Sequence, residues 1–204
     1  GALAWIGKEV DSSDIIHEIL QDLIYYQKSG GGITLSGGEP LQQKDFALDI
    51  LQKCREHRIH TAVETNLLTD INTLEAFLPW VDLWMCDFKM ADDTLHRKWT
   101  GHSNVPIIKN LEFLAKQAVP MTIRTPIIPN VNDSEEAIES ICRFIRQLPN
   151  QPAYELLGFH SLGFVKFENL GMKNPLSNSA FLKKGQLQKL NEILIRYNLN
   201  NNKK

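Results

Sequence analysis

Residues 31–40, Gly-Gly-Ile-Thr-Leu-Ser-Gly-Gly-Glu-Pro, constrain the fold of this chain more than any other segment. Residues that favour strands run directly into two adjacent glycines, which let the backbone adopt positive φ and leave no side chain in the way of a ligand. Glu39 adds a carboxylate that could accept from an ammonium group, and Pro40 ends the strand. The segment predicts a main-chain binding loop after a strand. A plain tight turn would read the same, so the functional interpretation depends on residues downstream.

The composition limits the class of protein. The chain has 204 residues, which suits one domain, and 43% of them are apolar. Its net charge of −2 indicates neither a nucleic acid nor a membrane surface as partner. No apolar run approaches the roughly 20 residues that span a bilayer. Three widely separated cysteines, Cys54, Cys86 and Cys142, favour a reducing, cytoplasmic setting and are expected to be buried small residues without disulfides.

Strand and helix patterns alternate along the chain. Helices are expected at 10–26, 45–58, 70–78, 106–117, 133–147 and 184–197, with an irregular piece at 92–101. Strands are expected at 32–36, 59–64, 81–88, 120–124 and 153–157. Five apolar strands, each followed by a helix, predict an α/β fold with a parallel sheet. Right-handed crossovers then bring the carboxyl ends of all strands to one edge, where ligands bind in such folds.

Polar residues follow the end of every predicted strand, so we expect them to meet in one pocket. They are Glu39, Glu64, Asp87, Lys89, Arg124 and His160. Such a pocket suits a zwitterion, because carboxylates and carbonyls would hold its ammonium group while lysine and arginine hold its carboxylate. Each residue also has an ordinary interpretation, for example Arg124 as a structural partner of Glu64. The other histidines are expected on helix surfaces or loops: His17, His57, His60, His96 and His102.

Five motifs, in this order and spacing, resemble the activating enzymes of glycyl-radical enzymes, a group of the radical S-adenosylmethionine (SAM) superfamily that includes pyruvate formate-lyase-activating enzyme. The motifs are residues 35–41, 64–66, 85–89, 124–133 and 155–160. The resemblance implies an open, TIM-like (β/α) partial barrel with helices outside, of whose six strands five are expected here. It also implies a radical SAM oxidoreductase that uses a [4Fe-4S] cluster to generate a glycyl radical on a partner such as pyruvate formate-lyase, with a flavodoxin or ferredoxin as reductant.

The resemblance implies roles for individual residues. Residues implied to bind SAM are Gly37, Gly38, Glu39, Asn66, Asp87, Lys89, Arg124 and His160. Among them, the 37–39 loop would receive the methionine amino group, and Arg124 and His160 would lie near the methionyl carboxylate and the far side of the cofactor. A monovalent-cation site is implied at Glu64, Thr65, the Met85 carbonyl and Asp87. The family more often has Asp where this chain has Glu64, and Pro-Tyr where it has Gly158-Phe159 before the histidine.

The largest departure is that the family's Cys-x-x-x-Cys-x-x-Cys cluster loop and its first strand do not occur in these residues. We therefore expect an N-terminally truncated radical SAM core domain over 1–204. Its parts would be a lead-in helix in 1–29 after a ferredoxin-like insert, a barrel in 30–199 and a disordered tail in 200–204. A naturally cluster-less protein is the alternative. No catalytic residue is assigned, and the chain alone is expected to be inactive.

Two other functions stay open. One is a barrel enzyme that binds a phosphorylated substrate through Gly37, Gly38 and Arg124, although the three carboxylates of the pocket would repel a phosphate. The other is a non-catalytic SAM-binding module that has lost its cluster. Residues 162–179 are interpreted as a long loop whose Phe164 and Phe167 are exposed, and the loop is either a surface for partner contact or an ordinary surface loop.

Overall fold

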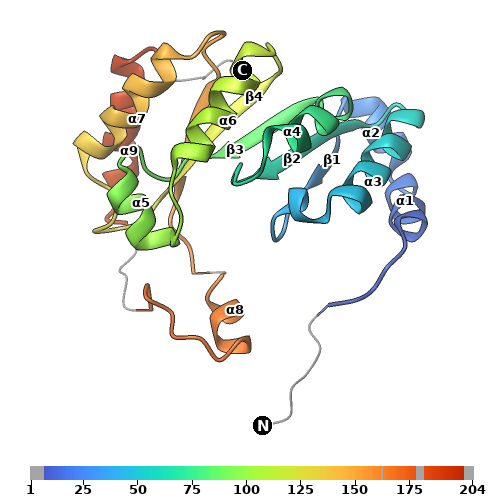
Figure 1. The fold of residues 1–204 in the computed structure, drawn as a ribbon, viewed down its shortest axis with the longest axis horizontal. Coiled ribbons are helices and arrows are strands. Elements are labelled where there is room, and N and C mark those ends of the chain that lie inside the picture. Colours follow the sequence, from blue (N-terminus) through green and yellow to red (C-terminus); the bar gives the residue numbers. More distant parts are fainter. Residues whose placement is uncertain (1–6, 162, 178–181, 200–204) are drawn as a thin grey trace.

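The structure, a computed structural model, describes residues 7–161, 163–177 and 182–199, and its centre is one parallel five-stranded sheet (Figure 1). The strands are β1 (Gly32–Leu35), β2 (His60–Thr65), β3 (Leu83–Asp87), β4 (Met121–Ile127) and β5 (Ala153–Gly158). They pair in chain order, each with the next. The predicted α/β fold with a parallel sheet is confirmed, and helices surround the sheet.

Helices connect the strands and flank the sheet. Before the sheet lie α1 (Ser12–Leu20) and α2 (Leu23–Ser29). The connections hold η1 (Pro40–Gln43), α3 (Lys44–Glu56), α4 (Ile71–Phe77), η2 (Leu78–Trp80), α5 (Asp93–Thr100), α6 (Val105–Lys116) and α7 (Glu135–Gln147). After β5 come α8 (Phe164–Asn169) and α9 (Gln186–Arg196). Each connection between strands returns the chain from the carboxyl end of one strand to the amino end of the next, as parallel pairing requires.

Three sequence expectations were wrong in detail. The helix expected at 10–26 is two helices, because the chain turns at Gln21 and Asp22 between them. The piece expected to be irregular at 92–101 forms α5, since Asp92 accepts from the Leu95 N–H at its start and Gly101 closes it at φ +80°. The segment expected as a loop at 162–179 contains α8, which Figure 1 draws apart from the other helices. Phe164 and Phe167 are half-buried instead of exposed.

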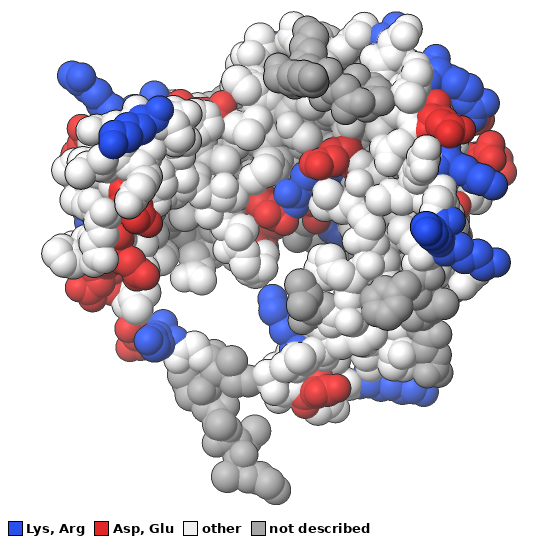
Figure 2. All heavy atoms as spheres, turned by 180° about the vertical axis from the view of Figure 1, so that it is seen from behind, with Lys and Arg blue, Asp and Glu red and all other residues white. Residues whose placement is uncertain are grey.

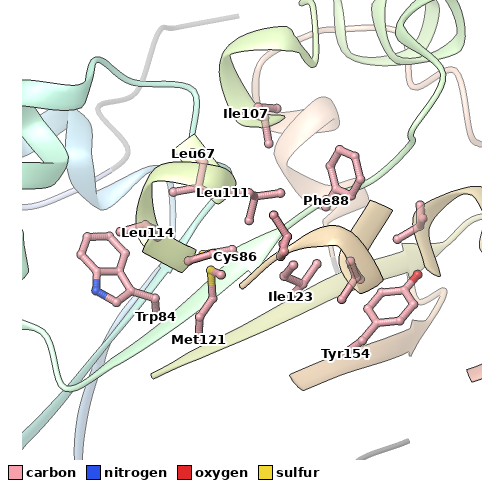
Figure 3. Packing of buried hydrophobic residues seen from close by; sticks show 14 of the residues in the cluster. Leu67, Trp84, Cys86, Phe88, Ile107, Leu111, Leu114, Met121, Ile123 and Tyr154 are labelled. Atoms are coloured by element: carbon pink, nitrogen blue, oxygen red, sulfur yellow. The ribbon is translucent and has the colours of Figure 1, made fainter. Parts of the chain in front are cut away.

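The main core lies between the sheet and the helices α3, α4, α6, α7 and α9, and its pattern in β3 follows strand alternation. Trp84 and Cys86 of β3 and the next residue but one, Phe88, are fully buried, and Figure 3 shows them beside Leu111 and Leu114 of α6. Burial of each such side chain contributes about 1.5–3 kcal/mol. The alternate residues of the strands point to the other face of the sheet and are less buried, and near the carboxyl ends they include the charged Glu64, Asp87 and Arg124.

The remaining expectations concern cysteines, histidines and the chain ends. All three cysteines are free and buried. His96 is not a surface residue: it is 3% exposed, and its Nδ1 lies 2.7 Å from the His102 carbonyl oxygen. None of the described helices is long and apolar enough to cross a membrane. The tail expected at 200–204 lies outside the described residues.

Candidate functional site

A cleft of about 170 Å³ opens at the carboxyl ends of β1, β2 and β3. Its lining unites most of the residues that the sequence pointed to: Gly37, Gly38, Glu39, Glu64, Thr65, Asn66, Asp87 and Lys89. Figure 2 shows a hollow in the middle of one face of the molecule in which acidic and basic side chains adjoin. The parallel register creates this gathering, because every strand delivers its last residues to the same edge.

The loop after β1 presents bare main chain to the cleft. Gly37 has φ +113°, a conformation that disfavours residues with a side chain. A Cβ atom built on Gly37 or Gly38 would meet nothing within 4 Å. The glycines are therefore not needed to avoid a clash within the described part of the chain, and the space beside them is free for a ligand.

Glu39 ties this loop to the end of β2. Its Oε1 accepts from the Thr65 hydroxyl at 2.8 Å and from the Leu41 N–H at 3.2 Å, and its Oε2 accepts from the Asn66 N–H at 2.8 Å. Both carboxylate oxygens are thus occupied by donors of the chain itself. The arrangement fixes the glycine loop against β2 and leaves ligand recognition to the main chain of the loop.

Four charged side chains form a second group on the same sheet face. The guanidinium of Arg124 contacts the Glu64 carboxylate, and its Nη2 lies 3.5 Å from Asp87 Oδ1. Lys89 Nζ lies 3.0 Å from the other Asp87 oxygen. The register explains these contacts, since Asp87 stands opposite Arg124 and Glu64 opposite Met85 across neighbouring strands. The group balances two positive against two negative charges.

Arg124 keeps one donor unused within the described structure. Its side chain is only 12% exposed, and the buried Nε atom has no hydrogen-bond acceptor. Its Nη1 makes only a long contact of 3.7 Å with the Met85 sulfur. A buried donor without an acceptor is costly, so this nitrogen indicates a place where an acceptor from outside the chain would be stabilised.

Two parts of the site implied by the sequence, His160 and the cation site, are not formed as expected. His160 is exposed, follows the end of β5 and does not line the cleft. At the implied cation site, the Arg124 guanidinium already bridges Glu64 and Asp87, and the Thr65 hydroxyl is engaged with Glu39. Among the residues that the structure describes, no three His, Cys, Asp or Glu side chains are grouped to hold a metal ion.

The cysteines do not fit a cluster. Cys54 lies in α3, Cys86 in β3 and Cys142 in α7, and each is fully buried. Burial raises the pKa of Cys54 to about 11 and that of Cys142 to about 12, and it raises the pKa of Cys86 as well. Ligation needs clustered thiolates, whereas these are separate, protonated thiols. The described residues therefore supply no cluster ligands.

The cleft is not the largest hollow of the molecule. One of about 250 Å³ lies on the far side of Lys89 toward α5 and α7, and one of about 390 Å³ lies beside α9 and is lined by Lys183, Lys184 and Lys189. Neither contains the open glycines or the paired carboxylates and cations. The residues that line it, and not its volume, therefore make the smaller cleft the candidate binding site.

Sequence reasoning missed three buried donors behind the cleft: Asn104, Thr125 and Asn132. They donate to main-chain carbonyls of the segment that follows β3. Asn132 lies inside the motif at 124–133, which was the only signal for it. A single buried amide has no periodicity, so no pattern could show which carbonyls it would reach.

Three comparisons bear on this site. The family description "Radical SAM superfamily" matches residues 7–144. Isethionate sulfite-lyase activating enzyme of Desulfovibrio desulfuricans is 38% identical over 179 residues, which cover 87% of this chain and 57% of that protein. Pyruvate formate-lyase-activating enzyme of Clostridium pasteurianum is 34% identical over 188 residues, which cover 92% and 79%. A crystal structure of a domain of pyruvate-formate lyase-activating enzyme from Bacteroides vulgatus superposes with a TM-score of 0.70 at 31% identity, covering 83% of this chain and 96% of that one.

Proposed function

Because the chain belongs to the radical SAM superfamily, and within it to the activating enzymes of glycyl-radical enzymes, we propose that it is the SAM-binding part of a protein that generates a glycyl radical on a partner enzyme. The chain spans 57% of the length of the isethionate sulfite-lyase activating enzyme, so the activity is proposed for a whole protein of that kind and not for these 204 residues alone. The names of the relatives differ in the enzyme that is activated. The partner is accordingly proposed as a glycyl-radical enzyme, of which pyruvate formate-lyase is one candidate.

The observation that carries the proposal is the cleft that combines open glycine main chain with Asp87 and Lys89, and whose Asp87 is contacted from behind by Arg124. The methionyl part of SAM bears an ammonium and a carboxylate group side by side. Main-chain carbonyls at 37–38 and the Asp87 carboxylate would accept from the ammonium, while Lys89 would donate to the carboxylate and the nearly buried Arg124 would add its positive charge from behind. Asn66, which lines the cleft, and the exposed His160 are proposed as further contacts.

The family's cofactors are SAM and a [4Fe-4S] cluster, which together supply one-electron cleavage of the sulfonium when both are bound. The residues of this chain would bind the SAM, orient it and keep water from it. Because the described cysteines do not fit a cluster, no step is assigned to them. We propose that the chain on its own binds SAM without catalysing a reaction.

Further parts of the proposal concern the surroundings of the cleft. A flavodoxin or ferredoxin would be the reductant. A monovalent cation at Glu64, Thr65, Met85 and Asp87 would require the Arg124 guanidinium to move from between the two carboxylates. The segment around α8 exposes apolar side chains of Val165, Leu170 and Met172 and is the proposed contact surface for the partner. A phosphate-binding enzyme is disfavoured, because three carboxylates line the cleft.

Calorimetric titration of SAM into the 204-residue chain tests the proposal. We expect measurable binding, and a loss of at least about 100-fold in affinity in the double variant Asp87→Ala, Lys89→Ala, because two charge-assisted contacts are removed. The control is Glu139→Ala, Arg196→Ala, which removes a surface ion pair between α7 and α9 at 3.3 Å. Equal affinity in both double variants would contradict the assigned site, and no binding by the unaltered chain would contradict a preformed pocket.

A further inference from the structure

The segment that follows β3, residues 88–91, has four successive main-chain carbonyls that each accept a hydrogen bond from a buried side chain. Thr125 Oγ1 donates to the first carbonyl at 2.6 Å, and Asn132 Nδ2 donates to the second at 2.9 Å. Asn104 Nδ2 donates to the third and the fourth, each at 2.9 Å. We call these three donors the carbonyl clamp. The second carbonyl belongs to Lys89, the cation of the cleft.

The clamp is almost completely buried. Thr125, Asn132 and Asn104 are 0%, 3% and 1% exposed. A buried polar side chain is tolerated only where its hydrogen bonds are made, so its partners are held in one geometry. The Thr125 hydroxyl is itself fixed, since it accepts from the Tyr154 hydroxyl at 3.1 Å, and this tyrosine is also buried. Residues 88–91 are therefore held from several sides.

Asn132 has the most connections of the three donors. Its Nδ2 also donates to the Pro126 carbonyl at 2.9 Å, and its Oδ1 accepts from the Ile128 N–H at 2.7 Å. The two hydrogens of the carboxamide nitrogen and its one oxygen thus join the main chain after β3 to the main chain at the end of β4. Those two strands carry Asp87 and Arg124, so the amide couples the two halves of the charged group.

We propose that Asn132 is a positioning residue that acts through Lys89. By holding the Lys89 carbonyl it fixes the backbone from which the side chain starts, and so keeps the ammonium in the cleft, 3.0 Å from Asp87. This inference rests on the proposed function, in which Lys89 takes up the carboxylate of SAM. Preorganisation of this kind increases affinity because the lysine is not ordered anew when the ligand binds.

A double-mutant cycle separates positioning from general stabilisation. SAM affinity is measured by calorimetry for the unaltered chain, Asn132→Ala, Lys89→Ala and the double variant. We expect Asn132→Ala to weaken binding about tenfold, the equivalent of one or two lost hydrogen bonds. In the Lys89→Ala background the same change should have no further effect, because the residue through which Asn132 acts is absent. Additive losses would overturn the proposal.

A second readout does not depend on SAM. Hydrogen exchange of the chain without added SAM should be faster at residues 88–91 in Asn132→Ala, because the segment loses the one clamp bond that holds the Lys89 carbonyl and opens more readily. Unchanged exchange there would overturn the proposal. If the unaltered chain does not bind SAM, the proposed function of the cleft fails together with the affinity effect, whereas faster exchange would still support Asn132 as the residue that fixes Lys89.

The control is Thr61→Val at the opposite end of the sheet. Thr61 is also 0% exposed, and its hydroxyl donates to the Trp80 carbonyl at 2.7 Å. We expect this variant to lower the melting temperature without changing SAM affinity or exchange at 88–91, and an equal loss of affinity would overturn a specific role for Asn132. If Asn132→Ala does not fold, Asn132→Asp replaces it in the cycle, since it keeps the acceptor for Ile128 and removes the donors.

Discussion

We call the side of the sheet where the parallel strands begin the amino edge and the side where they end the carboxyl edge. The two use similar residues for different purposes. At the amino edge, Asp82 Oδ2 accepts from the Thr61 N–H at 2.9 Å and from its hydroxyl at 3.1 Å, while Oδ1 lies 3.2 Å from Arg55. At the carboxyl edge, Arg124 also meets carboxylates, yet its buried Nε has no acceptor and a cleft lies beside it. The difference teaches that complete pairing indicates a structural role, whereas an unpaired buried donor beside open main chain indicates a ligand.

The motif at 31–40 contains one glycine with a structural role and one beside the cleft. Substituting the first gives the largest expected change in the free energy of unfolding. A Cβ atom on Gly32 would lie 1.7 Å from the His60 carbonyl oxygen of the paired strand, whereas one on Gly38 would meet nothing within 4 Å. We expect Gly32→Ala to lower the free energy of unfolding by about 3 kcal/mol or more, because two backbones must separate. Urea denaturation measures the change.

Gly38→Ala is the matched comparison for Gly32→Ala. It should change the free energy of unfolding by less than about 0.5 kcal/mol, since the new methyl group is free of contacts. It should nevertheless weaken SAM binding, because the methyl group occupies space assigned to the ligand. If Gly38→Ala were as destabilising as Gly32→Ala, the division between a structural and a ligand-binding edge would not hold.

The acidic residues of the two edges give the next largest effect. Asp82→Ala removes the acceptor of the Thr61 N–H and the partner of Arg55, while the Thr61 hydroxyl keeps the Trp80 carbonyl, so we expect a loss of about 2 kcal/mol in the free energy of unfolding with unchanged SAM affinity. Asp87→Ala should have the opposite profile. Its carboxylate contacts two cations and offsets their mutual repulsion, so we expect stability to fall by about 1 kcal/mol while SAM affinity is lost.

Urea denaturation and calorimetry on the two aspartate variants provide the measurement. A large loss of affinity in Asp82→Ala would mean that the amino edge communicates with the cleft. A loss of stability in Asp87→Ala as large as in Asp82→Ala would assign a structural role to the charged group. Either result would contradict the assignment of a structural role to Asp82 and a ligand-binding role to Asp87.

The carboxyl edge was more predictable from sequence than the contacts that support it. Strand alternation and the parallel crossovers follow from apolar runs, and they bring Glu64, Asp87 and Arg124 together without any knowledge of side-chain conformation. The turn at Gln21 was missed because the apolar spacing of α1 continues into α2. The clamp of Asn132 was missed because its partners are main-chain carbonyls, which every residue possesses and no pattern distinguishes.

His96 illustrates the same limit at a single residue. It was expected on a helix surface or a loop, within a segment taken to be irregular, but it lies buried in α5, and its ring meets the His102 carbonyl and the Thr100 hydroxyl, the latter at 3.1 Å. The return of the chain after Gly101 covers the ring. Hydropathy spacing records which face of a helix is apolar, whereas burial of a polar ring depends on where the following loop folds back.

Buried thiols provide the smallest effect and a further test of the comparison. A cysteine that reacted or bound a ligand at the carboxyl edge would ionise readily. Cys54 instead packs in the core, and burial raises its pKa to about 11 from 9.0. The unfolded chain therefore releases this proton first. The stability contributed by the protonated thiol is fully present below pH 9 and is lost as the pH rises from about 9 to 11, by about 1 kcal/mol at pH 10.

Urea denaturation at pH 8, 9 and 10 measures this loss, and Cys54→Ala provides the control. The variant should be less stable at pH 8 because a buried side chain is truncated, but its stability should fall less steeply with pH. Cys142, whose pKa burial raises to about 12, adds a loss of the same sign and remains in both proteins. An identical pH dependence in Cys54→Ala would mean that the Cys54 thiol is not held protonated by the core, and the cysteines would have to be reconsidered as reactive groups.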